Sequence, residues 1–106
     1  MAEISTVAII TAKPGRGDEL EPLLRSLAEA THGEDGCVLY SLQRGLQDRD
    51  VFVTVEKWES AGHLEQHLAS PHVADALAGA GDILAEAPRI VAAEPLTVGD
   101  AAKSSY

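Results

Sequence analysis

The strands expected from this sequence are apolar on both faces, and this feature restricts the fold more than any other. The first, residues 4–12, carries apolar residues on each side: Ile4, Ala8 and Ile10 on one, Val7 and Ile9 on the other. Another, residues 51–59, alternates in the same way: Val51, Val53 and Val55 against Phe52, Thr54 and Trp58. Strands of this kind belong in a sheet that is covered on both faces. The chain supplies helices for one face only, so we expect a second copy to cover the other in an obligate homodimer.

Turn and capping signals set the order of the elements. The expected order is a strand at 4–12, a helix from Asp18 to the 33–36 turn, a hairpin at 37–45 and 51–59, helical pieces from Ser60 and Ser70, and a strand at 89–98. Asp18 with Glu21 resembles a capping box, and Pro71 suits a first helical position. This order predicts an α+β, ferredoxin-like βαββαβ fold with a four-stranded antiparallel sheet and its helices on one face. We expect one domain at 1–98 and a mobile tail at 99–106.

The net charge of the chain excludes some classes of binding partner. It has 17 acidic and 8 basic residues among 106, for a net charge of −9. Nucleic acid needs a basic surface, and so does an anionic membrane, so neither is an expected partner. The N-terminus lacks the basic and apolar regions of a secretory signal, and no apolar stretch is long enough to span a membrane. We therefore expect a cytoplasmic protein.

One face of the hairpin combines aromatic and polar residues. A turn centred near residue 48 places Tyr40 opposite Glu56 and Val38 opposite Trp58. The mixed face then holds Tyr40, Leu42, Phe52, Thr54, Glu56 and Trp58, and the other face, expected to be ordinary core, holds Leu39, Ser41, Val51, Val53 and Val55. A flat, mostly apolar surface with a carboxylate and a phenol suits a small planar ligand. The alternative is that the aromatic rings simply pack while Glu56 and Tyr40 bond to each other.

Four histidines and one cysteine are the remaining reactive side chains. His63 and His67 have a spacing that can bind zinc, but no third ligand is evident, so no metal is expected. His67 lies at the edge of an apolar helical stripe, where it is either a partly buried, hydrogen-bonded histidine or a general base. His72 begins a helical piece, which favours a neutral imidazole able to accept a proton or contact a ligand. Cys37 lies in an apolar run typical of a buried, inert thiol.

The sequence carries no cofactor-binding motif. Residues 14–17 include two glycines but not the Lys-Ser/Thr of a phosphate loop, and no dinucleotide fingerprint follows a strand. We expect no cofactor, which restricts redox chemistry to what the substrate itself can carry.

Four segments in order resemble the antibiotic biosynthesis monooxygenase family: residues 13–15 (KPG), 34–40 (EDGCVLY), 53–60 (VTVEKWES) and 67–72 (HLASPH). The resemblance implies a dimeric α+β barrel of two ferredoxin-like protomers. Some members are cofactor-free monooxygenases of quinols or polycyclic phenols, others degrade haem, and others isomerise small sugar-derived phosphates. Carried over by position, Trp58 would stack on the substrate, Tyr40 and Glu56 would orient its hydroxyl, and His67 or His72 would take its proton. Phe52 and Thr54 would complete the substrate-binding surface.

The chain departs from this family pattern in two places. It contains no asparagine, although the monooxygenase and haem-degrading branches use one, so Thr54, Gln43 or Gln66 would have to replace that amide. Leu77 or a neighbour stands where the haem branch has its axial histidine, which argues against haem degradation.

The leading hypothesis is a cofactor-independent monooxygenase that oxidises a quinol or phenolic polycyclic aromatic with O2. The site is expected on the helix side of the sheet, because only there could His67 face Tyr40 and Glu56. The alternatives are an isomerase or epimerase in the same site, and a non-catalytic dimeric ligand-binding or stress-response module. Only Arg44 and Lys57 lie near enough in sequence to hold a phosphorylated substrate.

Overall fold

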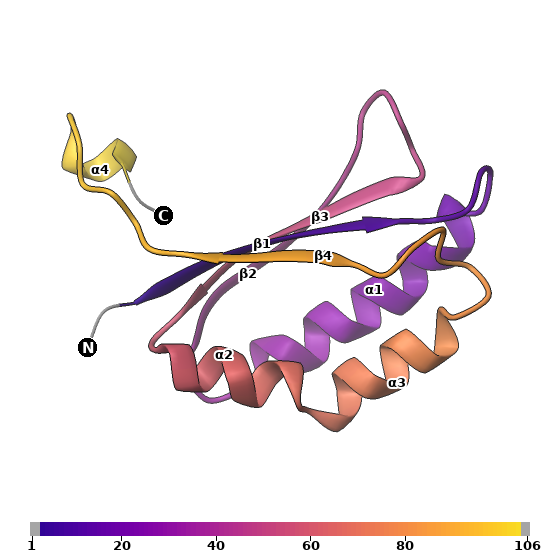
Figure 1. The fold of residues 1–106 in the computed structure, drawn as a ribbon, viewed down its shortest axis with the longest axis horizontal. Helices are drawn as coiled ribbons and strands as arrows, with labels where there is room; N and C mark the ends of the chain where they lie inside the picture. The colour runs from indigo at the N-terminus through magenta and orange to yellow at the C-terminus, as the bar shows by residue number, and fades with distance from the viewer. Residues whose placement is uncertain (1–2, 105–106) are drawn as a thin grey trace.

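A computed structural model describes residues 3–104. Its elements are β1 (Ile4–Thr11), α1 (Gly17–His32), β2 (Cys37–Arg44), β3 (Val51–Trp58), α2 (Ala61–Leu68), α3 (Pro71–Gly79), β4 (Arg89–Ala93) and a short α4 (Ala101–Ser104). The strands form one antiparallel sheet in the order β2-β3-β1-β4 (Figure 1). This is the ferredoxin-like α+β fold predicted from the order of the elements.

The register of the hairpin is confirmed at its centre and wrong at its open end. Tyr40 pairs with Glu56 as predicted, whereas Trp58 pairs with Cys37 instead of Val38. A β-bulge between Cys37 and Leu39 causes the difference, because one extra residue on β2 shifts the pairing beyond it. Val38 is exposed as a result.

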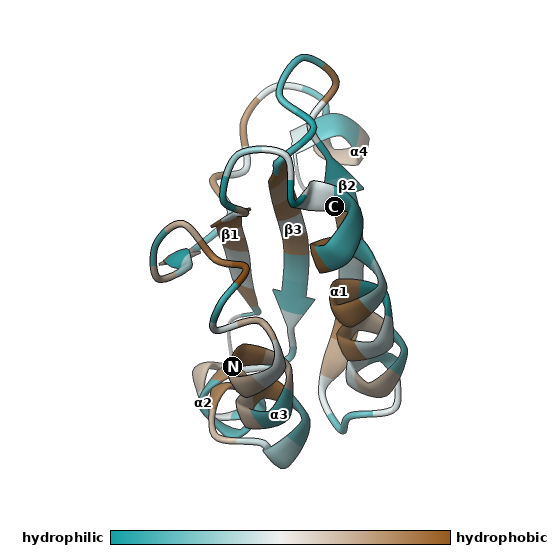
Figure 2. Ribbon diagram, turned by 90° about the vertical axis from the view of Figure 1, so that its right-hand side faces the viewer, coloured by the Kyte–Doolittle hydropathy of each residue, from teal (hydrophilic) through white to brown (hydrophobic). Residues whose placement is uncertain are grey.

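The helices α1, α2 and α3 all lie against one face of the sheet, whereas the short α4 lies on the opposite side, beyond the end of the strands (Figure 1). The covered face is built from the even-numbered residues of β1 and β3, which are buried apart from Ile4. The odd-numbered face, predicted as ordinary core on the hairpin, is therefore the open one. Its central residues are aliphatic and half-exposed: Val7, Ile9, Val53 and Val55. Figure 2 shows apolar residues along both β1 and β3.

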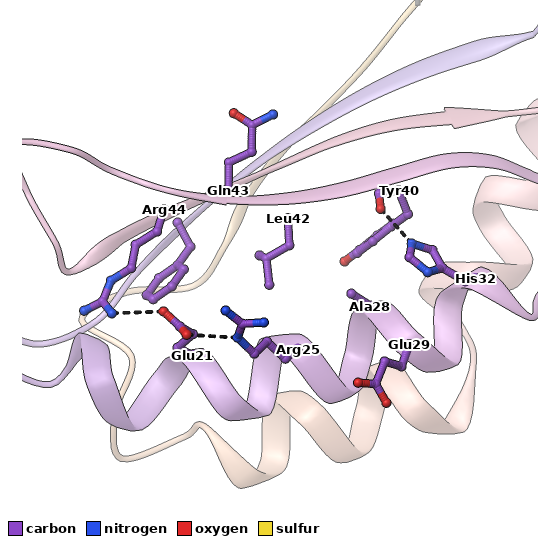
Figure 3. A pocket seen from close by; sticks show the side chains of 10 residues that line it. Glu21, Arg25, Ala28, Glu29, His32, Tyr40, Leu42, Gln43 and Arg44 are labelled. Carbon is purple, nitrogen blue, oxygen red and sulfur yellow. Dashed lines mark hydrogen bonds and ion pairs between the residues drawn. The ribbon is translucent and has the colours of Figure 1, made fainter.

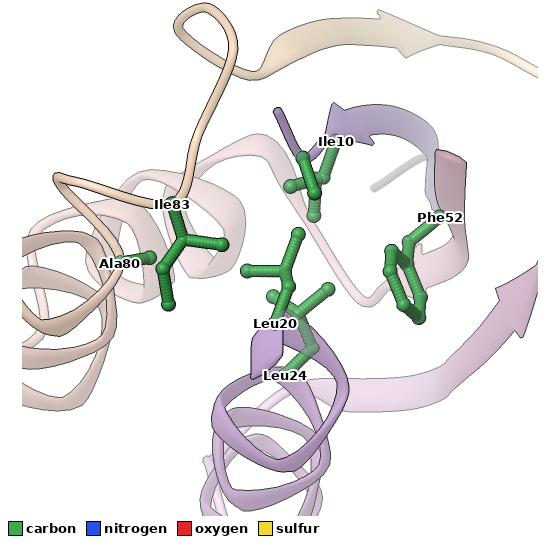
Figure 4. Close-up of a cluster of buried hydrophobic side chains, with 7 residues drawn as sticks. Ile10, Leu20, Leu24, Phe52, Ala80 and Ile83 are labelled. Atoms are coloured by element: carbon green, nitrogen blue, oxygen red, sulfur yellow. The ribbon is translucent and has the colours of Figure 1, made fainter. Parts of the chain in front are cut away.

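The apolar core lies between the sheet and the helices in two clusters. At one end Ile10 and Phe52 from the sheet meet Leu20 and Leu24 from α1, with Ala80 and Ile83 from the segment after α3 (Figure 4). At the other end Tyr40 and Trp58 pack with Ala28 and Leu64. The middle of the layer, between these clusters, is where the cavity described below lies.

The N-terminus of α1 is held by a distant residue and not by its own capping box. The helix begins at Gly17, and Asp18 is already inside it. The Asp50 carboxylate, from the turn before β3, accepts hydrogen bonds from the backbone N–H groups of Gly15 and Gly17, each at 2.9 Å. A carboxylate here satisfies free helix donors and complements the helix dipole. The predicted Asp18–Glu21 box is therefore wrong, and Glu21 binds Arg25 and Arg44 instead.

The boundaries of the other helices and strands agree more closely with those predicted from the sequence. Ser60 and Ser70 cap α2 and α3 as predicted, each hydroxyl accepting from the backbone N–H three residues later, and Pro71 begins α3. β4 is shorter than the expected 89–98 because residues 94–98 leave the sheet. In the segment 99–106, predicted to be mobile, Ala101–Ser104 forms a helical turn, and residues 105–106 lie outside the described part, as do residues 1–2. None of the helices described has the length and apolar character needed to cross a bilayer.

Candidate functional site

An apolar cavity of about 400 Å³ lies between the covered face of the sheet and the helices. Its walls come from β1, β2, β3, α1, α2 and α3 and from the segment leading into β4, and they include Thr6, Tyr40, Glu56 and His67. Three large apolar side chains in its wall, Leu68, Leu77 and Ile90, are also exposed to solvent. The volume and the mostly apolar lining with a few polar groups are typical of a small-molecule site.

His67 is the imidazole in this wall. It is carried by α2, is almost fully buried, and lies over the Trp58 ring with 4.7 Å between ring centroids. Its Nδ1 lies 2.5 Å from Oε2 of Glu34. A carboxylate accepts and does not donate, so in the neutral imidazole Nδ1 carries the proton and Nε2 holds the lone pair. Nε2 has no hydrogen-bond partner among the described residues, which leaves it available to the cavity.

Glu34 reaches His67 from the turn between α1 and β2. Gly36 shapes this turn, since its φ is 81° and a Cβ there would collide with the His63 ring. The same Glu34 oxygen also accepts from His72 Nε2 at 2.8 Å. Glu34 therefore ties the turn, α2 and α3 together and fixes the orientation of the His67 ring.

Glu56 is a buried carboxylate whose two oxygens are both held by donors. Thr54 Oγ1 donates to one at 2.6 Å, and Trp58 Nε1 donates to the other at 2.9 Å. Both donors fix the orientation of the carboxylate. Because carboxylate oxygens accept more than one hydrogen bond each, Glu56 can also accept from a ligand in the cavity that it lines.

Tyr40 contributes a phenol that stays protonated. Burial raises its pKa well above the ordinary value, the negative charges of Glu56 and Glu34 add to this, and a hydrogen bond with Thr54 works in the opposite direction. Tyr40 is therefore a hydrogen-bonding group at neutral pH and not a base.

Thr6 is the most unusual polar residue of the cavity. It is 1% exposed, lines the cavity, and its hydroxyl has no hydrogen-bond partner among the described residues. It pairs with Glu56 across β1 and β3 and lies on the same face. A buried hydroxyl without a partner costs about 1–3 kcal/mol.

Of the seven residues predicted for the site, three line the cavity: His67, Glu56 and Tyr40. The other four lie elsewhere. Trp58 is buried behind His67, Thr54 is directed to Glu56, and Phe52 belongs to the core at the other end of the sheet. His72 contacts the site through Glu34 and lines a shallower depression between α1 and α3. Trp58, predicted to stack on a substrate, is fully buried with His67 over its ring and does not belong to the cavity wall.

A second hollow of about 320 Å³ lies between α1 and β2 (Figure 3). Three of its charged side chains are paired with one another: Glu21 with Arg25 and Arg44. His32 bonds the backbone oxygen of Tyr40 on its edge. These contacts join the helix to the edge strand, which is a structural role.

Two groups of side chains could hold a metal ion by their composition. The donor atoms of Glu34, His67 and His72 lie within 4.8 Å of one another, as do those of Asp35, Glu59 and His63. In the first group the donors already bond to each other, and the second is largely exposed. His63 and His67, whose spacing was considered for zinc, belong to different groups.

The cations considered for a phosphorylated substrate lie away from the cavity. Arg44 is paired with Asp18 and Glu21, and Lys57 with Glu3. No lysine or arginine belongs to the cavity wall as far as residues 3–104 define it. Cys37 is partly buried, and burial raises the pKa of its thiol, which opposes thiolate formation.

Sequence reasoning missed two residues of the site, Glu34 and Thr6. Glu34 is brought to His67 only by the fold, and no local spacing connects positions 33 residues apart. Thr6 did leave a signal, since it is the polar member of a strand face otherwise formed by Ile4, Ala8 and Ile10.

The fold and this cavity define a small ferredoxin-like α+β domain with an apolar cavity that a histidine lines. A family model described as "Antibiotic biosynthesis monooxygenase" matches residues 4–79, which is most of the chain, and the chain belongs to this family.

Individual relatives agree with this assignment. PA3566 from Pseudomonas aeruginosa is 29% identical and superposes with a TM-score of 0.84, covering 91% of this chain and 96% of that one. The protein named "Putative monooxygenase Rv0793" from Mycobacterium tuberculosis is 28% identical over 93 residues, which are 88% of this chain and 91% of the relative. Its solved structure gives a TM-score of 0.82 over 93% of this chain and all of that one. A conserved protein from Methanosarcina mazei Go1 is 29% identical, with a TM-score of 0.80 over 89% and 93% of the two chains.

Proposed function

We propose that the chain is a cofactor-independent monooxygenase that oxidises a quinol or a phenolic polycyclic aromatic with O2. The observation that carries the proposal is the His67–Glu34 pair: Glu34 fixes the proton on Nδ1, and Nε2 is left without a partner at the wall of an apolar cavity. An imidazole oriented by a carboxylate is an effective general base.

The chemistry begins with proton transfer. His67 Nε2 takes the proton of a phenolic hydroxyl, and the apolar walls leave the resulting anion poorly solvated and electron-rich. The anion gives one electron to O2, and the two radicals combine at a ring carbon to form a peroxide anion, which takes the proton back from His67 to become a hydroperoxide. For an anthrone-type substrate, loss of water then converts the CH2 carbon into a carbonyl, so that one oxygen atom enters the product and the other leaves as water.

The other polar groups position the substrate. Tyr40 is protonated and can donate to the developing phenolate or peroxide oxygen. Glu56 is held by Thr54 and Trp58, which prevents it from turning away from the cavity. Thr54 and Trp58 thus act through Glu56, and His72 acts through Glu34.

Oxygen uptake with a hydroxyanthrone or menadiol, measured against the uncatalysed rate, tests the activity. His67→Ala is expected to lower kcat/KM by about 10²–10⁴-fold because it removes the base. Glu34→Gln is expected to lower kcat by about 10- to 100-fold with little change in KM, because it loosens the ring orientation and leaves the cavity intact. Rates equal to the uncatalysed control would contradict the proposal, and ligand binding without oxygen uptake would favour the non-catalytic alternative.

Asp35→Asn is the matched control. Asp35 is the neighbouring carboxylate, and it also faces a histidine, at 3.5 Å from His63 Nε2, but neither residue lines the cavity. Its kcat and KM should equal those of the wild type. An equal loss in Asp35→Asn and Glu34→Gln would mean that the Glu34 effect is general electrostatics and not the orientation of His67.

We also infer that the working form is a homodimer joined through the open face of the sheet. The central residues of that face are aliphatic and carry no helix, and Val91 of β4, in the same row, is 58% exposed. Apolar strand faces of this size are rarely left in water. A monomeric mass in light scattering at micromolar concentration would contradict this inference.

A further inference from the structure

Three threonines are buried almost completely, and they differ in one respect. Thr6, Thr31 and Thr54 are 1%, 0% and 1% exposed. The Thr31 hydroxyl donates to the backbone oxygen of Leu27 at 2.6 Å, and the Thr54 hydroxyl donates to Glu56 at 2.6 Å. The Thr6 hydroxyl bonds to nothing among the described residues. Native proteins rarely leave such a group unpaired, and an unpaired group in a cavity wall points to a ligand that completes it.

The position of Thr6 fixes where that ligand atom must lie. Thr6 on β1 and Glu56 on β3 are direct partners in the antiparallel register, and both line the cavity. The Cβ atoms of such pairs lie about 4.5–5.5 Å apart. Two ligand oxygens on neighbouring positions of one ring edge can therefore reach the two side chains at the same time. The rest of the cavity wall is mostly aliphatic and suits the apolar body of the ring system.

We propose that Thr6 is a ligand-binding and specificity-determining residue of this cavity, and that its hydroxyl bonds the second of two neighbouring oxygen atoms on an aromatic ligand. The first oxygen faces Glu56 and His67. The inference rests on the proposed function for the location and aromatic nature of the ligand, but it does not depend on turnover. It means that a ring with one hydroxyl leaves Thr6 unpaired, whereas a ring with two adjacent oxygens satisfies it.

Thr6→Val separates a ligand contact from a structural role, because valine has nearly the same shape and lacks only the hydroxyl. In the free protein the variant removes an unpaired buried group, so its Tm is expected to rise by about 4 °C or more. Thr31→Val is the matched control: it removes a hydroxyl that is already bonded, so its Tm is expected to fall. Thr6→Ser keeps the hydroxyl and should bind ligand as the wild type does.

Binding is measured by calorimetry in oxygen-free buffer with two probes, 1,8-dihydroxynaphthalene and 1-naphthol. The wild type is expected to bind the dihydroxy probe about 10-fold more tightly than 1-naphthol, the effect of one additional hydrogen bond. Thr6→Val is expected to lose this preference by weakening only the dihydroxy probe. Thr31→Val and Thr6→Ser should keep the preference.

Each other outcome overturns the inference in a recognisable way. A fall in Tm for Thr6→Val, as for Thr31→Val, would mean that its hydroxyl is structural. Equal affinity of the wild type for the two probes, or an unchanged preference in Thr6→Val, would rule out the contact between Thr6 and the ligand. Neither result would contradict the proposed monooxygenase activity. If neither probe binds the wild type, both this inference and the phenolic substrate fail. If both probes bind as expected but oxygen uptake is absent, only the proposed activity fails.

Discussion

The two faces of the sheet have opposite chemistry although they belong to the same strands. The covered face buries a carboxylate, an imidazole and three hydroxyl groups, among them the phenol of Tyr40, next to its apolar clusters. The open face is largely aliphatic in its centre, and its residues are only half-buried. Side chains alternate along a strand, so each face can be specified independently of the other. A chain of 106 residues can therefore carry the candidate site on one face and keep the centre of the other face aliphatic.

The contrast also explains where polar residues are tolerated. On the covered face each buried polar side chain except that of Thr6 has at least one partner within the described chain, and His67 has its partner at Nδ1. In the centre of the open face the side chains described are aliphatic, namely Val7, Ile9, Val53 and Val55, so a charge placed there would have nothing to pair with once the face is covered. The predictions below test this difference from its strongest consequence to its weakest.

Val55→Lys is expected to have the largest effect. Val55 lies in the central strand β3, between Ser41 and Val7 in the register of the open face. Burying an unpaired ammonium in an apolar interface would weaken the dimer by about 1000-fold or more. Light scattering should show the mass falling from dimer to monomer. Leu46→Lys, the same kind of change in the exposed hairpin turn, should leave the mass unchanged, and an equal effect of the two variants would contradict an interface on the open face.

Glu56→Ala probes the covered face. Its removal leaves the Trp58 N–H and the Thr54 hydroxyl without their acceptor in a buried site. The free energy of unfolding, from urea titration, is expected to fall by about 2–4 kcal/mol. Glu59→Ala, at an exposed position three residues further on, should change it by less than about 0.5 kcal/mol. Similar values for the two variants would mean that the buried network is not what stabilises this face.

Tyr40→Phe is expected to have a small effect at neutral pH and a distinct one in alkali. Near pH 8 it removes a hydrogen bond with Thr54, which costs about 1 kcal/mol. Because the pKa of Tyr40 is raised in the folded protein, the folded state holds this proton at pH values where the unfolded chain has lost it. The stabilisation that the raised pKa of Tyr40 gives the folded state is complete below about pH 10. It is lost as the pH rises beyond that value.

Urea titrations between pH 8 and pH 10.5 measure the free energy of unfolding of the wild type and of Tyr40→Phe. The wild type should lose stability above about pH 10 more steeply than Tyr40→Phe. Parallel curves for the two proteins would show that the environment of Tyr40 does not favour the neutral phenol.

The sequence predicted the parts of this molecule that depend on local patterns. The alternation in residues 4–12 and 51–59 defined the two faces, and the turn position placed Tyr40 beside Glu56. Ser60 and Ser70 were recognisable caps because a serine cap acts on its own helix.

The features that escaped prediction depend on contacts between distant segments. The bulge at Val38 has no local signal, and it was enough to move Trp58 to a different partner. The cap of α1 comes from Asp50, and the partner of His67 comes from Glu34, both about 33 residues away along the chain. Phe52 and Trp58 were assigned to the ligand by their side-chain type, but the packing of α1 and α2 buries both in the core.

The Asp50 cap has a consequence for engineering of the hairpin. Leu46 is 91% exposed, which by exposure alone marks the whole β2–β3 turn as a place for an inserted peptide or epitope. The far side of the turn is not equivalent, because Asp48 accepts from the Asp50 backbone and Asp50 holds the start of α1. An insertion next to Leu46 leaves those contacts in place, whereas one between Asp48 and Asp50 would release a helix that begins more than thirty residues earlier. The turn thus has one permissive half and one half that belongs to the scaffold.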